Sequence, residues 1–289
     1  MQIAIIGTDP SGLYLACLLK TRRPDSTVTI FDTGAPDRDA APPHILINPV
    51  KPELKLADAE LGARIMAAAS RTQGVVIRRD GEAVRTGGQA YAMIRAATLA
   101  TILRERAVAL GARIEAGSVG GRKPAQLGDV VVIADGAESV MRATLADGFK
   151  PELRPAKTRM MVFTADRSVA EPTFLFRRVS GAVFHAFLYP DGQGSSTLTV
   201  ETTALGLAAA GLEGAGAEKS AAFCTALFGP DLESRGITAR GARWRAFVGV
   251  RNGAWTSGNA VLLGAAAYNA HHSVGLGVRS GLEDAEALA

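Results

Sequence analysis

The chain has 289 residues, of which 47% are hydrophobic and 21% are charged. This balance is that of a globular protein with a buried core. The formal net charge is only +4 and no run of five or more Lys or Arg occurs, so we expect no nucleic-acid binding. No apolar stretch has membrane-spanning length, and the start MQIAIIG lacks the basic leader of a signal peptide. Cys17 and Cys224 stand alone in apolar helical patterns, which predicts buried thiols in a reducing, cytoplasmic setting.

The first elements predict a βαβ unit. Residues 2–6 form an apolar run that is typical of a buried parallel strand and ends at Gly7. Residues 11–21 have helical spacing and stop before Pro24. Residues 27–31 are rich in β-branched residues and lead to Asp32.

The turn after the first strand resembles a dinucleotide-binding fingerprint. In the pattern G-x-G-x-x-G the glycines allow a tight turn, a close approach to pyrophosphate and close helix–strand packing. Here Gly7 and Gly12 keep the outer positions, Ser11 opens the predicted helix, and Asp9 stands at the middle position. Asp32 follows Gly12 by twenty residues, where a carboxylate accepts hydrogen bonds from a ribose.

Asp9 leaves two interpretations of this turn open. Its carboxylate would repel a phosphate, by about 4 kcal/mol for two unit charges about 4 Å apart at a dielectric constant of about 20. Alternatively Asp9 caps the helix and satisfies its first N–H groups without a ligand.

Further along the chain, strand and helix patterns alternate. We expect an irregular segment over 34–54, a helix over 57–69, a strand over 74–79 and a hairpin turn at 80–81. Next come a helix over 99–110 and strands over 113–115 and 129–134. From 157 to 203, four antiparallel strands are predicted, followed by a helix over 219–228, a buried strand over 261–264 and a helix from 281. The sequence thus predicts an α/β fold in which a Rossmann-like domain, 1–156 and 244–289, carries an inserted antiparallel substrate sheet, 157–243.

Two stretches carry a family resemblance. Ala134-Asp135-Gly136, followed by Ser139 and Arg142, resembles a motif of flavoprotein aromatic hydroxylases. The segment 244–289, with VRNGAWTSGNAVLLG and AHHSVGLG, is similar to the flavin-contacting end of the salicylyl-CoA 5-hydroxylase and 2-aminobenzoyl-CoA monooxygenase group. The resemblance spans nearly the whole chain. It implies an FAD-dependent monooxygenase that uses NAD(P)H and oxygen to hydroxylate an aromatic acid or its CoA thioester.

The resemblance also implies roles for individual residues. His271 and Ser273 would face the flavin or the substrate, and His185 and Tyr189 on the predicted sheet are candidates for the substrate side. Together, His271, His185 and Tyr189 are the candidate catalytic residues. The candidate FAD-binding residues are Gly7, Ser11, Gly12, Asp32, Arg95, Asp135, Gly136, Gly264, Gly275 and Gly277.

Three flavin contacts of the family are altered. Asp9 replaces a glycine, Ala265 stands where an aspartate holds the ribityl chain, and Ala96 stands where an arginine is expected, with Arg95 one place away. The sequence also ends within its last helix where relatives continue, so an oligomer or a partner could cover this end. These departures keep two alternatives open, a non-catalytic homologue with weak or no flavin binding and an oxidoreductase that uses NAD alone.

The adjacent pair His271-His272 is not expected to bind a metal. No carboxylate or cysteine ligand accompanies the pair in the sequence, and neighbouring histidines without such a partner are rarely ligands.

Overall fold

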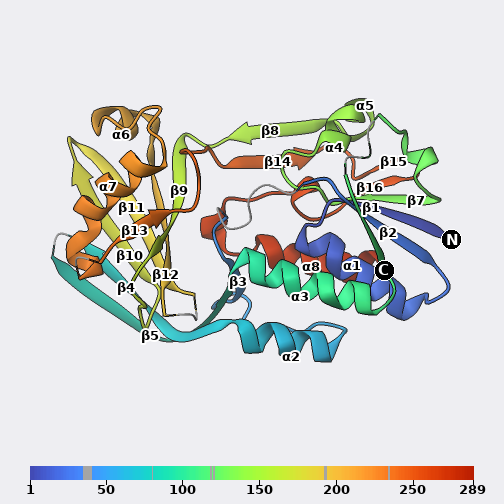
Figure 1. Cartoon of the computed structure of the whole chain (residues 1–289), viewed down its shortest axis with the longest axis horizontal. Coiled ribbons are helices and arrows are strands. Elements are labelled where there is room, and N and C mark those ends of the chain that lie inside the picture. Colours follow the sequence, from blue (N-terminus) through green and yellow to red (C-terminus); the bar gives the residue numbers. More distant parts are fainter. Residues whose placement is uncertain (35–40, 80, 118, 120, 192–193, 234) are drawn as a thin grey trace.

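The computed structural model describes all residues except 35–40, 80, 118, 120, 192–193 and 234. The chain forms two lobes side by side, each built on one large sheet (Figure 1). Both ends of the chain lie in the lobe that holds the first sheet. No helix in the described part of the chain is both long and apolar enough to cross a membrane.

The first lobe contains the parallel sheet that the sequence predicts. Its strand order is β15-β16-β7-β1-β2-β6. β1 lies between β2 and β7 and is parallel to both, and its residues Ile3 to Ile6 are buried because helices cover the sheet. The strands are β1 (Gln2–Ile6), β2 (Thr27–Asp32), β6 (Arg113–Ala116), β7 (Val130–Ile133), β15 (Thr256–Ser257) and β16 (Ala260–Leu262).

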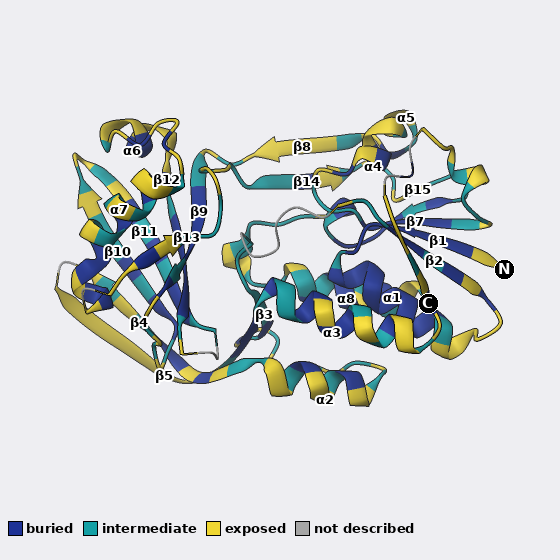
Figure 2. Cartoon of the chain, viewed as in Figure 1, coloured by how far each residue is buried: buried dark blue, intermediate teal, exposed yellow. Residues whose placement is uncertain are grey.

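Helices α1 (Pro10–Arg22), α3 (Ala96–Ala109) and α8 (Gly277–Leu288) pack together against one face of this sheet (Figure 1). α1 is buried along most of its length, as Figure 2 shows. The short helices α4 (Val140–Thr144) and α5 (Ala146–Phe149) follow β7. The βαβ unit predicted from residues 2–31 is confirmed.

The second lobe is a mostly antiparallel sheet with the strand order β13-β9-β12-β11-β10-β4-β5-β3. One of its faces carries Phe184 and Leu188, which pack with Cys224 and Phe228 of α7 in a buried cluster. The strands are β3 (His44–Ile47), β4 (Ser70–Arg79), β5 (Glu82–Ile94), β9 (Thr158–Ala165), β10 (Thr173–Val179), β11 (Ala182–Pro190), β12 (Ser196–Thr203) and β13 (Ile237–Ala239), and the helices are α6 (Ala204–Ala209) and α7 (Ala217–Phe228).

The remaining elements are short, and one pair of strands runs between the lobes. β8 (Pro151–Pro155) and β14 (Val248–Asn252) form a two-stranded ribbon that runs between the lobes (Figure 1). α2 (Ala59–Ala68) packs on α3. Four single 3₁₀ turns complete the described structure, η2 (Pro124–Gln126), η3 (Gly229–Leu232), η4 (Gly264–Ala266) and η5 (His272–Val274).

The predicted fold class, a Rossmann-like sheet with an added antiparallel sheet, is confirmed. The predicted hairpin is present, since Arg79 pairs with Glu82, although its residue 80 lies outside the described residues. The expectation of an irregular segment over 34–54 is wrong where β3 forms, because β3 gains backbone partners from β5. β3, β4 and β5 add residues from the first part of the chain to the second sheet. The division into 1–156, 157–243 and 244–289 stays a prediction.

Candidate active site

Gly7 and Gly12 hold the β1–α1 turn against β7. Gly7 has a φ of +94°, and a Cβ there would lie 2.4 Å from the carbonyl oxygen of Ala134. A Cβ on Gly12 would lie 2.8 Å from the Cβ of Ala134. Both positions therefore require glycine for the tight turn and the close helix–strand packing of a dinucleotide fold.

Asp9 caps α1 with its own carboxylate. Asp9 Oδ1 accepts hydrogen bonds from the backbone N–H of Ser11 at 3.0 Å and from Ser11 Oγ at 2.5 Å. Gly264 closes over this pair, since a Cβ there would lie 2.0 Å from Ser11 Oγ and 3.0 Å from Asp9 Oδ1. Asp9 therefore caps α1, and the N–H of Ser11 in the first turn is bonded within the chain itself.

Asp32 ends β2 beside the same turn. Its carboxylate forms an ion pair with Arg104 of α3 and accepts a hydrogen bond from Thr8 Oγ1 at 3.3 Å. Burial alone would raise the pKa of Asp32, but the hydrogen bond and charge of Arg104 hold it below its ordinary value. Asp32 is therefore an ionised hydrogen-bond acceptor at neutral pH, next to Thr8.

Asp135 lies on the other side of the turn, with its Cα next to Gly7. Burial raises the pKa of this carboxyl, and Oδ1 has no hydrogen-bond partner among the described residues. Gly136 follows with a φ of +91° and open space around it. The buried Arg142 does not reach Oδ1, because its guanidinium donates to the carbonyls of Ala266 and Ala137.

The second sheet presents an aromatic face with polar groups beside it. Phe174 stacks on Phe187 with ring centroids 4.4 Å apart, and Phe176 stacks on His185 at 4.9 Å. Tyr189 continues the row, 5.0 Å from Phe187. This row of Phe174, Phe176, His185, Phe187 and Tyr189, which we call the aromatic face, is built by alternate residues of β10 and β11, opposite to the face that packs on α7.

His185 and Tyr189, the two predicted residues on the aromatic face, differ in hydrogen bonding. The Tyr189 hydroxyl is buried and bonded to Thr199 Oγ1 at 3.1 Å, and burial raises its pKa, so it stays protonated. Burial lowers the pKa of His185, and its Nε2 has no hydrogen-bond partner in the described part of the chain. His185 is therefore neutral at physiological pH, with one ring nitrogen unsatisfied.

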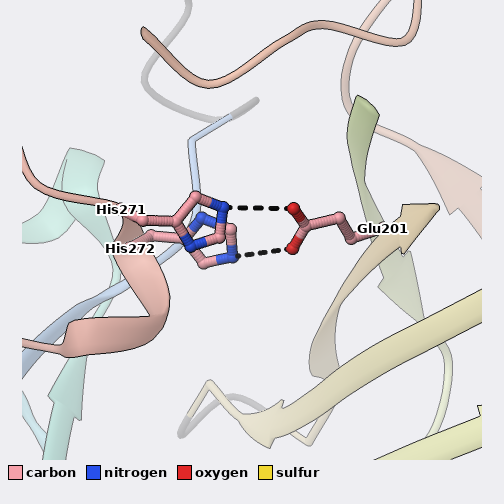
Figure 3. A group of neighbouring side chains, drawn as sticks. All are labelled: Glu201, His271 and His272. Carbon is pink, nitrogen blue, oxygen red and sulfur yellow. Dashed lines mark hydrogen bonds and ion pairs between the residues drawn. The ribbon is translucent and has the colours of Figure 1, made fainter. Parts of the chain in front are cut away.

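Two further histidines, His271 and His272, lie beside the carboxylate of Glu201 (Figure 3). His271 Nε2 lies 3.1 Å from Glu201 Oε1, and His272 Nε2 lies 3.8 Å from Oε2. Glu201 sits opposite His185 in the β11–β12 register, so the predicted residues His185 and His271 meet around a carboxylate that the sequence reasoning missed. Burial and the neighbouring His271 lower the pKa of His272 to about 4.

The remaining predicted residues border the two lobes. Gly275 has a φ of +68°, and its carbonyl accepts a hydrogen bond from Asn48 Nδ2 at 3.1 Å. Gly277 begins α8. Arg95 precedes α3 and lines a small cavity with Thr197, the residue that pairs with Tyr189 across β11 and β12. Arg95 is thus close to the second sheet, whereas the glycines of the β1–α1 turn lie in the first lobe.

Two curated proteins are similar to this chain in sequence. No family model matches the chain. It is 34% identical over 299 residues to a salicyloyl-CoA 5-hydroxylase of a Streptomyces species, covering all of this chain and 58% of that protein. It is 29% identical over 292 residues to the 3-hydroxy-4-methyl-anthranilyl-[aryl-carrier protein] 5-monooxygenase of Streptosporangium sibiricum, covering all of this chain and 78% of that one. The chain therefore spans little more than half the length of the first of these relatives.

Solved structures agree on the fold. A mutant of 2-methyl-3-hydroxypyridine-5-carboxylic acid oxygenase superposes with a TM-score of 0.77 at 17% identity, over 99% of this chain and 81% of that one. PqsL, a probable FAD-dependent monooxygenase from Pseudomonas aeruginosa, gives a TM-score of 0.70 at 20% identity, over 100% and 84%. The chain therefore shares the two-sheet fold of these solved oxygenases, and its sequence is similar over its whole length to the two monooxygenases above.

Proposed function

We propose that this chain carries the active site of an FAD-dependent monooxygenase that hydroxylates an aromatic acid or its thioester with NAD(P)H and oxygen. The names of both sequence relatives specify an aromatic acyl group on a carrier, which supports a thioester substrate. The two buried free cysteines, Cys17 and Cys224, fit a reducing cytoplasm.

The aromatic face beside Glu201 is the observation that carries the proposal. An aromatic ring can stack on Phe174 and Phe187, because their rings already pack in a parallel arrangement. Polar groups border the stack, with Glu201 and His271 at one edge and Thr197, whose hydroxyl is buried and lacks a partner among the described residues, near Tyr189. A mostly apolar surface with a few convergent polar groups is what a substrate site requires.

In this proposal the chain positions the ring and excludes water. The Phe side chains hold the ring plane, and the neutral His185, whose Nε2 has no partner among the described residues, bonds a hydroxyl or amino substituent. Tyr189 stays protonated and keeps its bond to Thr199, so it supports the floor of the site. Bound FAD, once reduced by NAD(P)H, supplies the activation of oxygen.

The residues at the β1–α1 turn fit the nucleotide part of FAD in most respects. Gly7 and Gly12 keep the turn close to β7, and Asp32 is placed to accept from a ribose hydroxyl. Asp135 has a buried Oδ1 without a described partner and a raised pKa. In its protonated form this carboxyl can donate a hydrogen bond to a phosphate oxygen, beside the open space at Gly136.

Asp9 is the one feature at the turn that opposes pyrophosphate. It adds a carboxylate at the tip of α1 and consumes the N–H of Ser11. We therefore expect FAD to bind more weakly than it would to a chain with glycine at this position. The same cap favours a second candidate function, a non-catalytic homologue that no longer binds flavin.

Titration of the purified chain with FAD tests the proposal and separates it from the second candidate. We expect saturable quenching of flavin fluorescence with one flavin bound per chain, and oxidation of NAD(P)H that an aromatic acid or thioester accelerates. A chain that retains no flavin after free FAD has been removed would contradict the proposal and support the non-catalytic candidate. Binding of NAD(P)H without flavin would instead favour the NAD-dependent alternative.

A further inference from the structure

Glu201, His271 and His272 form a cluster with the chemistry of a metal site. Their ligand atoms all lie within 4.8 Å of one another. Glu201 comes from β12 of the second sheet, and both histidines come from the segment that leads to α8, so the cluster joins two distant parts of the chain (Figure 3). We propose that Glu201, His271 and His272 bind a divalent transition-metal ion, with zinc as the best-fitting occupant.

The donor set fits zinc. Two imidazole nitrogens and one carboxylate are the protein ligands of catalytic zinc sites, in which a fourth position stays open for water or substrate. Ligands about 2.0–2.2 Å from a tetrahedral ion lie roughly 3.4 Å apart. Glu201 Oε1 lies 3.1 Å from His271 Nε2 and Glu201 Oε2 lies 3.8 Å from His272 Nε2, one distance on each side of this spacing. Small side-chain rotations can bring the third pair from its upper limit of 4.8 Å to the same spacing.

The groups around the cluster orient the ligands. His271 Nδ1 accepts a hydrogen bond from the backbone N–H of Ser273 at 3.3 Å and lies 2.9 Å from Ser273 Oγ, which fixes the orientation of the imidazole ring. Thr158 Oγ1 donates a hydrogen bond to Glu201 Oε1. Such outer hydrogen bonds to the metal ligands are typical of built metal sites and fix the direction of each ligand.

Two buried ring nitrogens near the cluster have no hydrogen-bond partner within the described ranges, His272 Nδ1 and His185 Nε2. Unsatisfied buried polar atoms cost free energy, so they indicate a missing water, ion or ligand. His185 lies opposite Glu201 in the β-sheet register. A water molecule on the ion could bond to His185 and satisfy its free nitrogen.

A bound ion would link the second sheet to the segment before α8. Because it would bind the folded chain and not the unfolded one, it raises the melting temperature. At a zinc concentration about 100 times the Kd, the expected rise in Tm is roughly 5 °C. This effect requires neither flavin nor turnover, so its failure would leave the proposed monooxygenase function untouched.

The test is a titration of chelator-treated protein, without added flavin, with Zn²⁺ by calorimetry and with Co²⁺ by visible absorption. We expect one ion per chain, a rise in Tm, and the visible absorption bands of cobalt bound by nitrogen and oxygen ligands. Saturable binding that is absent with Mg²⁺ is also expected, because imidazole nitrogen suits transition metals and Mg²⁺ prefers oxygen. No binding of either transition metal would overturn the proposal.

Three variants locate the ion. Glu201→Gln keeps the size and the hydrogen-bond acceptor but removes the charge, and His272→Ala removes one ligand. Each should weaken zinc binding about 100-fold or more, since loss of a mere outer partner already costs 10–100-fold. His44→Gln alters a histidine on β3 outside the cluster and should leave zinc affinity unchanged. Equal zinc affinity in all three variants and the original chain would place the ion elsewhere and contradict the proposal.

Discussion

The tip of α1 and the surroundings of the aromatic face differ in how far the chain itself supplies hydrogen-bond partners for their polar groups. At the tip of α1, Asp9 bonds to the N–H and to the hydroxyl of Ser11. At the aromatic face, His185 Nε2, His272 Nδ1 and Thr197 Oγ1 are buried without partners among the described residues. Unsatisfied buried polar atoms thus gather near the second sheet, and in the first lobe Asp135 Oδ1 beside the turn is another.

This difference teaches that a binding fold can keep its shape while its ligand contacts change. Gly7 and Gly12 are required by close contacts with Ala134 within the protein itself, so they would persist with or without a dinucleotide. Asp9, by contrast, caps the helix and changes whether the helix tip can bind an anionic ligand. The following predictions separate the glycines' structural role from the contacts that decide binding.

The largest expected effect is on folding, from Gly7→Ala. The variant forces a Cβ to 2.4 Å from the Ala134 carbonyl oxygen at a φ of +94°, and we expect a loss of about 3–5 kcal/mol in the free energy of unfolding. Gly136→Ala is the matched control, with a φ of +91° and no atom within 4 Å of the added Cβ. It should cost only about 1–2 kcal/mol. Urea unfolding of both variants checks the pair, and equal losses would show that the close contact with Ala134 does not matter.

The next largest effect is a change in FAD affinity when Asp9 is substituted. Asp9→Asn keeps a capping side chain and removes the charge, whereas Asp9→Gly also removes the volume and costs the helix only a few tenths of a kcal/mol. We expect both variants to bind FAD more tightly, by about 10-fold to 1000-fold, because the repulsion estimate is about 4 kcal/mol at most. Adding Ala265→Asp to Asp9→Gly should increase retention further.

Calorimetric titration with FAD measures these affinities. If Asp9→Asn and Asp9→Gly bind no more tightly than the original chain, the pyrophosphate does not approach the tip of α1. If only the glycine variant gains, the side-chain volume of Asp9, and not its charge, excludes the cofactor.

Much of the first lobe could be predicted because its signals are local. Apolar runs, Gly7, Gly12 and Asp32 lie within about thirty residues of one another and need no partner to be recognised. The sequence does not predict β3, because its Pro-rich surroundings resemble a loop and its residues pair with residues of β5 that follow 45 to 50 positions later. β8 and β14 were missed for a similar reason, since β8 has proline at both ends and its partner lies nearly a hundred residues along the chain.

The candidate site shows the same limit. The resemblance points to His271 and the predicted sheet points to His185 and Tyr189, and the structure puts His185 and His271 beside one carboxylate. Glu201 could not be chosen, because a single glutamate in an alternating strand usually faces solvent. Only the register of β11 and β12, which places Glu201 opposite His185, gives it a role, and strand register is not written in local sequence. The expectation that His271 and His272 lack a carboxylate partner is wrong for this reason.

A smaller effect is the pH dependence of stability that the carboxyls of Asp32 and Asp135, near the turn, produce. The folded pKa of Asp135 is raised, so its stabilising protonated form is present below the unfolded pKa and is lost as the pH rises through the folded pKa. The folded pKa of Asp32 is lowered, so its contribution is present above the unfolded pKa and is lost as the pH falls. Asp135→Asn should therefore gain stability relative to the original chain as the pH rises from about 4.

Asp32→Asn should show the opposite trend, with its deficit growing as the pH rises above the folded pKa of Asp32. Urea unfolding from acid to neutral pH measures both variants against the original chain. Parallel pH profiles for the two variants would mean that the Asp135 carboxyl finds a partner in solution and is not held in its neutral form.

The smallest expected effect tests whether the floor of the aromatic face is already satisfied. Tyr189→Phe removes the hydroxyl bonded to Thr199 Oγ1 and should cost about 0.5–1.5 kcal/mol, since the net value of one hydrogen bond is of this size. Thr199→Val removes the other partner, leaves the buried Tyr189 hydroxyl unpaired and should cost about 1–3 kcal/mol. The double variant should lose less than the sum of the two single variants, because neither partner is then left unsatisfied. Additive losses in urea unfolding would show that Tyr189 finds another partner and is free to turn toward a bound ring.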